Sequence, residues 1–348
     1  RVRVVHGGVS FSNSYLHSHC LEALKSSENI IKAIEGMESD DVFNAGRGSN
    51  LTRKGKVECE AAVVFIDRSS EMSFGAVGAL SRIEHPIALA DLIARSRQES
   101  SRGLIDPMIL VGGGAESWAK EQGMSLCSNE DLITGKASKT RDRAMETVDC
   151  LNEVVNEDAM DTVGGVEYDT EKEEWTAGVS SGGITVKRDG RLGHCTVMGA
   201  GVWVERARVQ KNDITIVRTV CISCSGCGES LMRTDASRCI ARLILHRRLD
   251  EPCTSAVDRF FIDHFNSKNP MLRGFPVDRL VVGGVIIVKE EELNLKEEED
   301  SSYDLLDFVV FHNSPSFPVA FVDSKGKSKK LLSKKEPHAN VHIAAFPL

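Results

Sequence analysis

The sequence predicts an α+β protein in which helices are layered against β-sheets. Short apolar segments typical of strands come in antiparallel-looking runs near both ends of the chain, with helical segments between them. Strand–helix alternation does not continue throughout, as a doubly wound nucleotide-binding fold would require. The length of 348 residues allows one large domain or two ordinary ones.

The first half of the chain begins with a strand followed by a helical region. Val2–Val5 is rich in β-branched residues and precedes Gly7-Gly8, which favours a buried strand that ends in a turn. Leu16–Met37 repeats apolar residues at helical spacing, with a break expected at Ser26-Ser27. The next expected elements are strands over Val57–Ile66 and Met72–Leu80, a helix over Pro86–Arg97, and a tight helix entry at Gly112-Gly113-Gly114.

The middle of the chain differs in character from its two halves. Between Met124 and Asp161 few apolar residues recur at a fixed period, so we expect a flexible segment over about 125–159. Further strands are then expected from Thr162, over Trp175–Val179, Cys195–Val204, Asp213–Ser223, Leu280–Val288 and Phe308–His312, with a helix around Ala236–Ile244. The acidic run Glu290–Glu292 indicates a solvated loop.

Composition and charge exclude several classes of protein. Net charge is −8, which argues against a surface that coats nucleic acid or anionic membrane as a whole. The longest apolar run, Leu280–Val288, is far shorter than the roughly 18–20 residues of a membrane span. Arg1–Ser14 lacks the apolar stretch of a signal peptide. We therefore expect a soluble, intracellular protein.

The cysteines favour free thiols over a disulfide framework or a metal site. The 10 Cys show no repeating short spacing, which is typical of thiols in a reducing compartment. Cys221, Cys224 and Cys227 resemble part of an iron–sulfur pattern, but the fourth ligand would fall at Leu231. In a strand, Cys221 and Cys224 would also point to opposite faces. No metal is expected.

Thr162 is the candidate nucleophile. The Ser-Gly segments contain no G-x-S-x-G, the motif of one common class of serine hydrolase. Thr162 instead opens a strand after Asp161 and a polar segment. If the Asp161–Thr162 bond is cut, the new α-amine, with a pKa of about 7.7–8, can act as general base for the hydroxyl of the same residue. By itself, the Asp-Thr pair indicates only the start of a strand.

Other motifs around Thr162 favour the catalytic interpretation. They are Asn44-Ala45-Gly46-Arg47-Gly48-Ser49, Ser180-Ser181-Gly182-Gly183, Gly190-Arg191-Leu192-Gly193-His194, Gly199-Ala200-Gly201 and Ser225-Gly226-Cys227-Gly228-Glu229. In this order they resemble the plant-type asparaginase group of N-terminal-nucleophile hydrolases, over nearly the whole chain. Within that group, the strand start at Thr162 and the Ser180 and Ser225 motifs look most like the threonine aspartases (taspases), which cut proteins after Asp.

The resemblance implies a fold and a set of roles. The fold would be a single four-layer αββα sandwich, made as a zymogen and split into an α subunit, 1–161, and a β subunit, 162–348. Thr162 would attack the Asp161 carbonyl during self-cleavage and the substrate carbonyl afterwards. The Ser181 hydroxyl would hold the amine and hydroxyl of Thr162 in register, and Asn44 and the Ser225–Gly226 pair would donate hydrogen bonds to the oxyanion.

Substrate specificity is expected to depend on Arg191, His194 and Gly228. Arg191 matches the family's carboxylate clamp, and Gly228 matches a substrate-binding position. His194 stands where asparaginases usually carry an Asp that pairs with the substrate α-ammonium. A site without that anion suits a peptide-bound Asp better than free asparagine. His194 could also be only a tolerated polar residue at the edge of the site.

The sequence therefore predicts a threonine endopeptidase that cleaves proteins after Asp and needs no cofactor. One alternative is an L-asparaginase or isoaspartyl peptidase acting on small substrates, and another is an uncleaved scaffold. Departures from the family's pattern include Glu60, where Asp is more usual. The family also implies a homodimer or (αβ)2 assembly in the cytoplasm and nucleus. The basic cluster Lys325–Lys335 would then be an import signal or, alternatively, a solvated surface loop.

Overall fold

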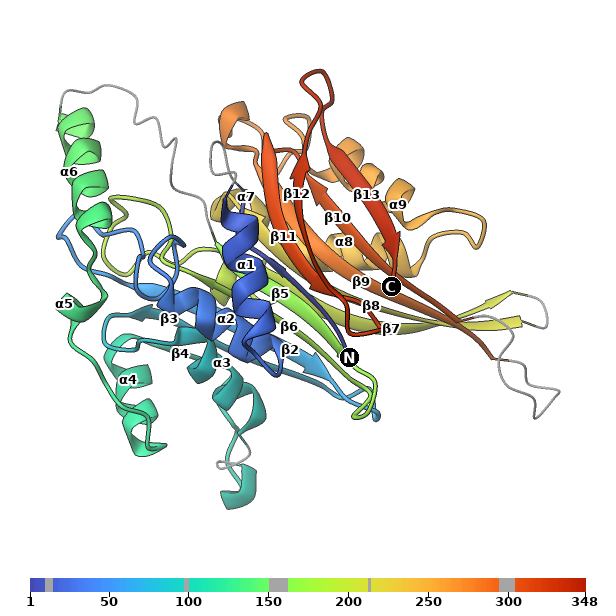
Figure 1. Ribbon diagram of the computed structural model, residues 1–348, viewed down its shortest axis with the longest axis horizontal. Helices are drawn as coiled ribbons and strands as arrows, with labels where there is room; N and C mark the ends of the chain where they lie inside the picture. Colours follow the sequence, from blue (N-terminus) through green and yellow to red (C-terminus); the bar gives the residue numbers. More distant parts are fainter. Residues whose placement is uncertain (10–14, 97–99, 150–161, 212–213, 294–303) are drawn as a thin grey trace.

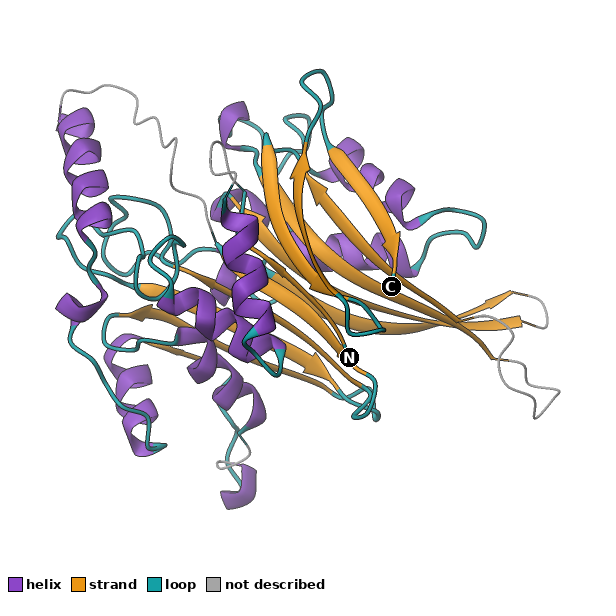
Figure 2. Ribbon diagram, viewed as in Figure 1, coloured by secondary structure: helices purple, strands orange, loops and turns teal. Residues whose placement is uncertain are grey.

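Two β-sheets packed face to face, with helices on both outer faces, form the protein in this computed structural model (Figures 1 and 2). The structure describes residues 1–9, 15–96, 100–149, 162–211, 214–293 and 304–348. Figures 1 and 2 show helices beside the larger sheet at one side of the molecule and others beyond the smaller sheet at the opposite side. This is the predicted four-layer αββα arrangement.

Within the described residues, the larger sheet has eight strands in the order β12-β11-β1-β5-β6-β2-β3-β4, and the smaller has five in the order β13-β10-β9-β8-β7. Neighbouring strands pair antiparallel except β3 and β4, which are parallel. The strands are β1 (Val2–His6), β2 (Cys59–Ile66), β3 (Met72–Leu80), β4 (Ile109–Val111), β5 (Val163–Asp169), β6 (Glu174–Ser181), β7 (Val202–Lys211), β8 (Ile214–Gly226), β9 (Val282–Leu293), β10 (Asp304–His312), β11 (Ser316–Val322), β12 (Ser328–Lys334) and β13 (His342–Pro347).

The helices divide between the two outer layers. Those of the described chain are α1 (Leu16–Lys25), α2 (Ile30–Ser39), α3 (Pro86–Arg95), α4 (Gly112–Glu121), α5 (Asn129–Leu132), α6 (Gly135–Asp149), α7 (Gly228–Thr234), α8 (Ala236–Leu245) and α9 (Cys253–Arg259). Helices α1 to α4 pack on the larger sheet, and α8 and α9 pack on the smaller one. No helix in the described part of the chain combines the length and apolarity needed to cross a membrane.

The core consists of three main apolar layers. The central layer fills the space between the sheets and includes Val64, Val179, Val285 and Phe308. One outer layer lies between the larger sheet and α1 to α4, and the other lies between the smaller sheet and α8 and α9. Every residue of β2 is buried, because both faces of this central strand are covered.

Most of the predicted elements are confirmed. The Leu16–Met37 region is two helices, α1 and α2, separated near Ser26-Ser27 as expected, and Asn29 caps α2 by accepting a hydrogen bond from the Lys32 backbone N–H at 2.9 Å. The Gly112-Gly113-Gly114 run opens α4 directly after β4. Sequence analysis missed the three last strands, β11 to β13, and the helix α9.

Three local predictions are wrong. Cys195–Val204 is not a continuous strand, because a 3₁₀ turn over His194–Thr196 and a positive φ of 87° at Gly199 precede β7. Glu290 is not in a solvated loop; it lies in β9, buried, and pairs with Arg218 and Arg247. Much of the basic cluster belongs to β12, where Lys329 and Lys330 are exposed on a strand rather than on a loop.

The polar segment before Thr162 is only partly described. Its residues 125–149 contain α5 and α6, and Leu132 and Ala137 are buried against Leu51 and Val57. The predicted flexibility of 125–159 stays a prediction, and Asp161 lies outside the described residues with the rest of 150–161.

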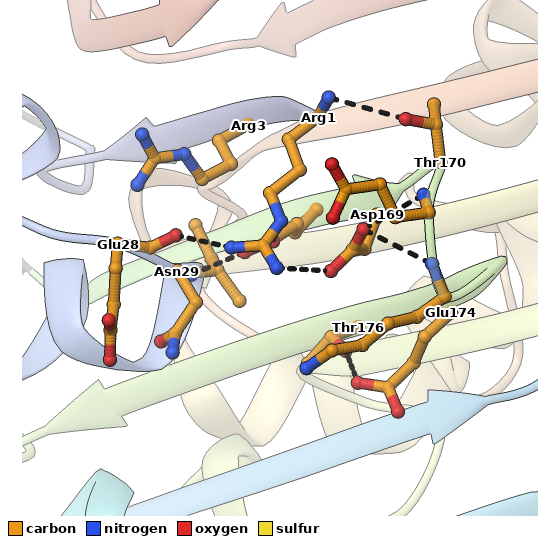
Figure 3. A network of polar contacts seen from close by, with 12 residues as sticks. Arg1, Arg3, Glu28, Asn29, Asp169, Thr170, Glu174 and Thr176 are labelled. Carbon is orange, nitrogen blue, oxygen red and sulfur yellow. Dashed lines mark hydrogen bonds and ion pairs between the residues drawn. The ribbon is translucent and has the colours of Figure 1, made fainter.

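Polar contacts join the start of β1 to α2 and to the end of β5 (Figure 3). Arg1 donates from Nη1 to the Glu28 backbone oxygen at 2.9 Å, and its Nη2 lies 2.7 Å from Asp169 Oδ2. Because the Arg1 side chain is one-third exposed, this pair contributes little to stability. Backbone pairing between β1 and β5 remains the main link between these segments.

We expect Gly75→Ala to destabilise the protein. A Cβ at Gly75 would lie 2.2 Å from the Ala90 backbone oxygen and 2.4 Å from the Ala94 backbone nitrogen, so α3 would have to move away from β3. Overpacking of this kind typically costs about 1–3 kcal/mol. Urea unfolding should show a lower midpoint for this variant. Gly113→Ala is the control, because its added Cβ would meet nothing within 4 Å apart from its chain neighbours and the backbone of its own helix; an unchanged midpoint for Gly75→Ala would contradict the packing.

Candidate active site

Strand register brings Thr162 against Ser181. Val163 pairs with Ser180 where β5 and β6 run antiparallel. Thr162, the residue before Val163, therefore lies beside Ser181, the residue after Ser180. Thr162 Oγ1 donates to Ser181 Oγ at 3.0 Å, and both side chains are buried. Residues two apart in a strand share a face, which places Thr162 on the same face as Val166, in the central layer.

The next strand adds a carboxylate to the same row. Glu60 pairs with Ser181 between β2 and β6, so Thr162, Ser181 and Glu60 come from three adjacent strands. Glu60 is 1% exposed and accepts a hydrogen bond from the Gly193 backbone N–H. Sequence analysis noted Glu60 only as a departure from Asp and did not place it in the site.

The Ser180-Ser181-Gly182-Gly183 turn connects Thr162 to Asn44 through hydrogen bonds. Ser181 Oγ accepts from the Gly183 N–H at 3.0 Å, and Asn44 Nδ2 donates to the Gly183 oxygen at 2.9 Å. Asn44 Oδ1 accepts from the Asn50 N–H at 2.8 Å. A Cβ at Gly182 would lie 2.5 Å from Asn44 Oδ1, so only glycine lets this loop approach so closely. Asn44 Nδ2 keeps a second hydrogen that can be donated to an oxyanion.

A small pocket contains most of the predicted site residues. Its lining consists of Asn44, Glu60, Thr162, Ser181, Gly183, Ile184, Arg191, His194, Gly226 and Gly228. Ser225 is fully buried beside it, where its Oγ accepts from the Val9 N–H at 3.4 Å. Gly226 ends β8, so the smaller sheet supplies one wall of the pocket and the larger sheet supplies the nucleophile.

Arg191 carries an ion pair at the rim of the pocket. Its Nε and Nη2 donate to the Glu229 carboxylate at 2.6–3.0 Å. Burial alone would raise the pKa of Glu229, but the hydrogen bonds and charge of Arg191 lower that pKa below its usual value. Glu229 is the second residue whose role sequence analysis missed; the signal was its position in the Ser225–Glu229 motif, three residues after Gly226.

Two histidines are buried near Thr162. His194 is 3% exposed and donates from Nε2 to the Cys224 backbone oxygen at 3.2 Å, and burial lowers its pKa. His6 contacts Ser223 Oγ through Nε2 at 2.9 Å, and burial lowers its pKa to about 3. Neither ring is the side-chain partner of Thr162 Oγ1, which is Ser181. Neither imidazole is therefore placed to accept the proton of Thr162 Oγ1, and another group has to act as the base.

One set of described side chains could hold a metal ion. The ligand atoms of Glu60, His194 and Cys195 all lie within 4.8 Å of one another. Burial raises the pKa of the Cys195 thiol well above its usual value, and the positive charges of Arg191 and Lys187 lie close enough to affect these groups. A cation bound there would lie near these two positively charged side chains, so the donor set suits a metal poorly. Cys221, Cys224 and Cys227 are buried free thiols.

Comparison with known proteins identifies the family. The family model described as asparaginase matches residues 17–268. The chain belongs to this asparaginase family. Its members are N-terminal-nucleophile hydrolases, in agreement with the αββα fold, and we refer to the chain below as an asparaginase-family hydrolase.

Similar proteins carry the names isoaspartyl peptidase and L-asparaginase. The chain is 33% identical to the isoaspartyl peptidase/L-asparaginase of Xenopus laevis over 62% of this chain and 60% of that protein. It is 30% identical to the isoaspartyl peptidase of Salmonella typhimurium over 78% of this chain and 77% of that protein. It is also 30% identical to the plant-type L-asparaginase of Thermococcus kodakarensis over 61% of this chain and 64% of that protein. The chain thus spans less than two-thirds of the length of the frog and archaeal relatives.

We expect Ser181→Ala to lower kcat for whichever substrate the enzyme hydrolyses. The change removes the acceptor of Thr162 Oγ1 and leaves the buried Gly183 N–H without its partner. Losing such a bond costs about 1–3 kcal/mol, or roughly 5–150-fold in rate if the loss is felt in the transition state. Steady-state kinetics would measure kcat. Ser237→Ala is the control, because Ser237 is also buried and donates to a backbone oxygen, that of Ala200; equal losses in both variants would contradict a specific role.

Proposed function

We propose that this asparaginase-family hydrolase activates itself by cutting the Asp161–Thr162 bond. Thr162 Oγ would attack the Asp161 carbonyl carbon, and the C–N bond would break to give an ester and a free α-amine. Water would then hydrolyse the ester, leaving the Asp161 carboxylate and a free Thr162. The supporting observation is the burial of Thr162 at the head of β5, with its Oγ1 3.0 Å from Ser181 Oγ.

The two products of this cut would stay together. In the larger sheet, β1 from the first half of the chain lies between β11 and β5, and β6 lies between β5 and β2. Strands of the two halves therefore alternate and share backbone hydrogen bonds on both sides of the cut. A homodimer or (αβ)2 assembly and a location in the cytoplasm and nucleus remain part of the proposal by resemblance.

Catalysis would use the new α-amine as base. An α-amine with a pKa of about 7.7–8 is partly unprotonated at neutral pH and lies on the same residue as the hydroxyl. Thr162 would form an acyl-enzyme with the substrate, while Asn44 Nδ2 and the Gly226 N–H, both at the pocket, donate to the oxyanion. Neither His194 nor His6 is the side-chain partner of Thr162 Oγ1, which is Ser181, and this supports a mechanism without a catalytic imidazole.

For the substrate, we infer an Asp residue within a protein, with cleavage on its C-terminal side. Arg191 can bind the side-chain carboxylate, and His194 brings no negative charge to the position where asparaginases usually carry Asp. The chain would then be a threonine endopeptidase of the taspase type.

The second candidate is an L-asparaginase or isoaspartyl peptidase. Two observations favour it: the names of the relatives, and the buried Glu60 in the pocket, whose carboxylate could pair with a substrate α-ammonium in place of the missing Asp. The same nucleophile and clamp serve both candidates, so substrate choice has to be measured.

We expect Thr162→Ala to remain a single uncut chain, because the reaction needs the Thr162 hydroxyl. Thr162→Ser should keep partial activity, since hydroxyl and amine survive while the methyl group that restricts the rotamer is lost. Intact-mass measurement of the purified proteins checks both. Cleavage of the Ala variant into two fragments between residues 161 and 162 would disprove the mechanism. An uncut wild-type chain would favour a scaffold.

Substitutions at Arg191 and His194 should separate the two substrate classes. Arg191→Ala should lower kcat/KM for an Asp peptide far more than for the matching Asn peptide, because a hydrogen bond to a charged group is worth roughly 1.5–3 kcal/mol. His194→Asp should shift activity towards free asparagine or isoaspartyl dipeptides, since it adds an anion that repels a peptide Asp. Efficient hydrolysis of asparagine by the wild type, with none of the peptide, would select the second candidate.

A further inference from the structure

The guanidinium of Arg191 has two usable edges, and Glu229 occupies one of them. Nε and Nη2 make all three hydrogen bonds to the Glu229 carboxylate. Nη1 makes no hydrogen bond to any residue that the structure describes. Its two N–H groups are therefore available to a bound molecule.

The available nitrogen faces the pocket. A Cβ added to Gly183 would lie 3.2 Å from Arg191 Nη1, and one added to Gly193 would lie 3.0 Å from it, so Nη1 is close to both glycines. Gly183 lines the pocket together with Thr162, whereas Glu229 is not among the lining residues. A Cβ added to Gly228, which also lines the pocket, would lie 3.2 Å from Nη2, so both nitrogens lie near the pocket lining, but Glu229 occupies Nη2 and leaves Nη1 for a bound molecule.

We propose that Glu229 is a positioning residue that orients Arg191 for the substrate carboxylate. An arginine side chain has many rotamers, and ordering it on binding reduces affinity. Glu229 orders the guanidinium before the substrate arrives and directs Nη1 to the pocket. The inference rests on the proposed function only in assigning the carboxylate to Arg191, and it applies to a peptide Asp and to free asparagine alike.

A competing role for Glu229 makes the opposite prediction. The Glu229 side chain is 40% exposed, so it could turn into solvent and release the Nε–Nη2 edge to a substrate carboxylate. In that case Glu229 would compete with the substrate, and removing it would tighten binding. Arg191 is only 16% exposed, and its Nη1 already reaches the pocket without any such movement, which favours the positioning role.

The test compares Glu229→Ala and Glu229→Asp with the wild type, using an Asp peptide and free asparagine. We expect KM for the hydrolysed substrate to rise about 3–10-fold with kcat nearly unchanged, as for the loss of an orienting hydrogen bond. Glu229→Asp keeps the charge but withdraws it by one methylene, so it should also raise KM. A lower KM in these variants would overturn the proposal, as would an unchanged KM.

A double-mutant cycle provides the decisive control. If Glu229 acts through Arg191, Glu229→Ala should have no further effect on KM in an Arg191→Ala background. A full additional effect in that background would contradict the proposal. Glu251→Gln is the matched control. The Glu251 carboxylate lies 3.1 Å from Arg259 Nη2, and neither residue lines the pocket. This variant should leave KM unchanged.

Ligand binding separates failure of this proposal from failure of the proposed function. L-aspartate carries the carboxylate and can be titrated calorimetrically into the self-cleaved enzyme without turnover. A Kd that rises about 3–10-fold in Glu229→Ala supports positioning whichever substrate is hydrolysed. Hydrolysis that depends on Thr162, with KM and Kd insensitive to Glu229, refutes the positioning role alone. Absence of both hydrolysis and aspartate binding in the wild type refutes both proposals.

Discussion

Antiparallel hydrogen bonding among β5, β6 and β2 is the constraint on which the site depends. The register that pairs Val163 with Ser180 and Ser181 with Glu60 brings the candidate nucleophile Thr162, its hydroxyl partner and a carboxylate into one row. A shift of one residue in either pairing would turn these side chains to the opposite face. Burial of the strands on both faces prevents such a shift, because it would expose the apolar residues of the central layer.

The close approach of the two sheets gives the site its other wall. Gly164, two residues after the nucleophile, has room for no side chain: a Cβ there would lie 2.4 Å from Ser223 Oγ on the smaller sheet. Small residues at such positions let Gly226, at the end of β8, and Gly228, at the start of α7, reach the pocket. The chemistry of the site therefore depends on packing between sheets as much as on the identity of the nucleophile, and substitutions in β8 could affect it without touching substrate.

Charge in and around the pocket is balanced by pairing. Glu229 neutralises Arg191 at the rim, while Glu60 is buried with a backbone N–H as its hydrogen-bond donor. Lys187 is also buried, and burial lowers its pKa. A bound carboxylate would thus meet oriented donors rather than a large excess of positive charge, and recognition would depend on direction more than on attraction at a distance.

Sequence alone determined much of this protein. Periodicity and turn residues predicted most helices and strands, because these are local signals in the chain. The motifs carried the family resemblance that pointed to Thr162, Ser181, Asn44 and Arg191. Tertiary structure decided what lies next to what. Glu290 reads as part of a solvated acidic run, yet it is buried with Arg218, a partner 72 residues away that no local pattern can reveal. The contacts of Glu60 and Glu229 depend on tertiary structure for the same reason. Strand register and sheet packing set contacts between residues that are distant in the sequence, and no local pattern reveals them.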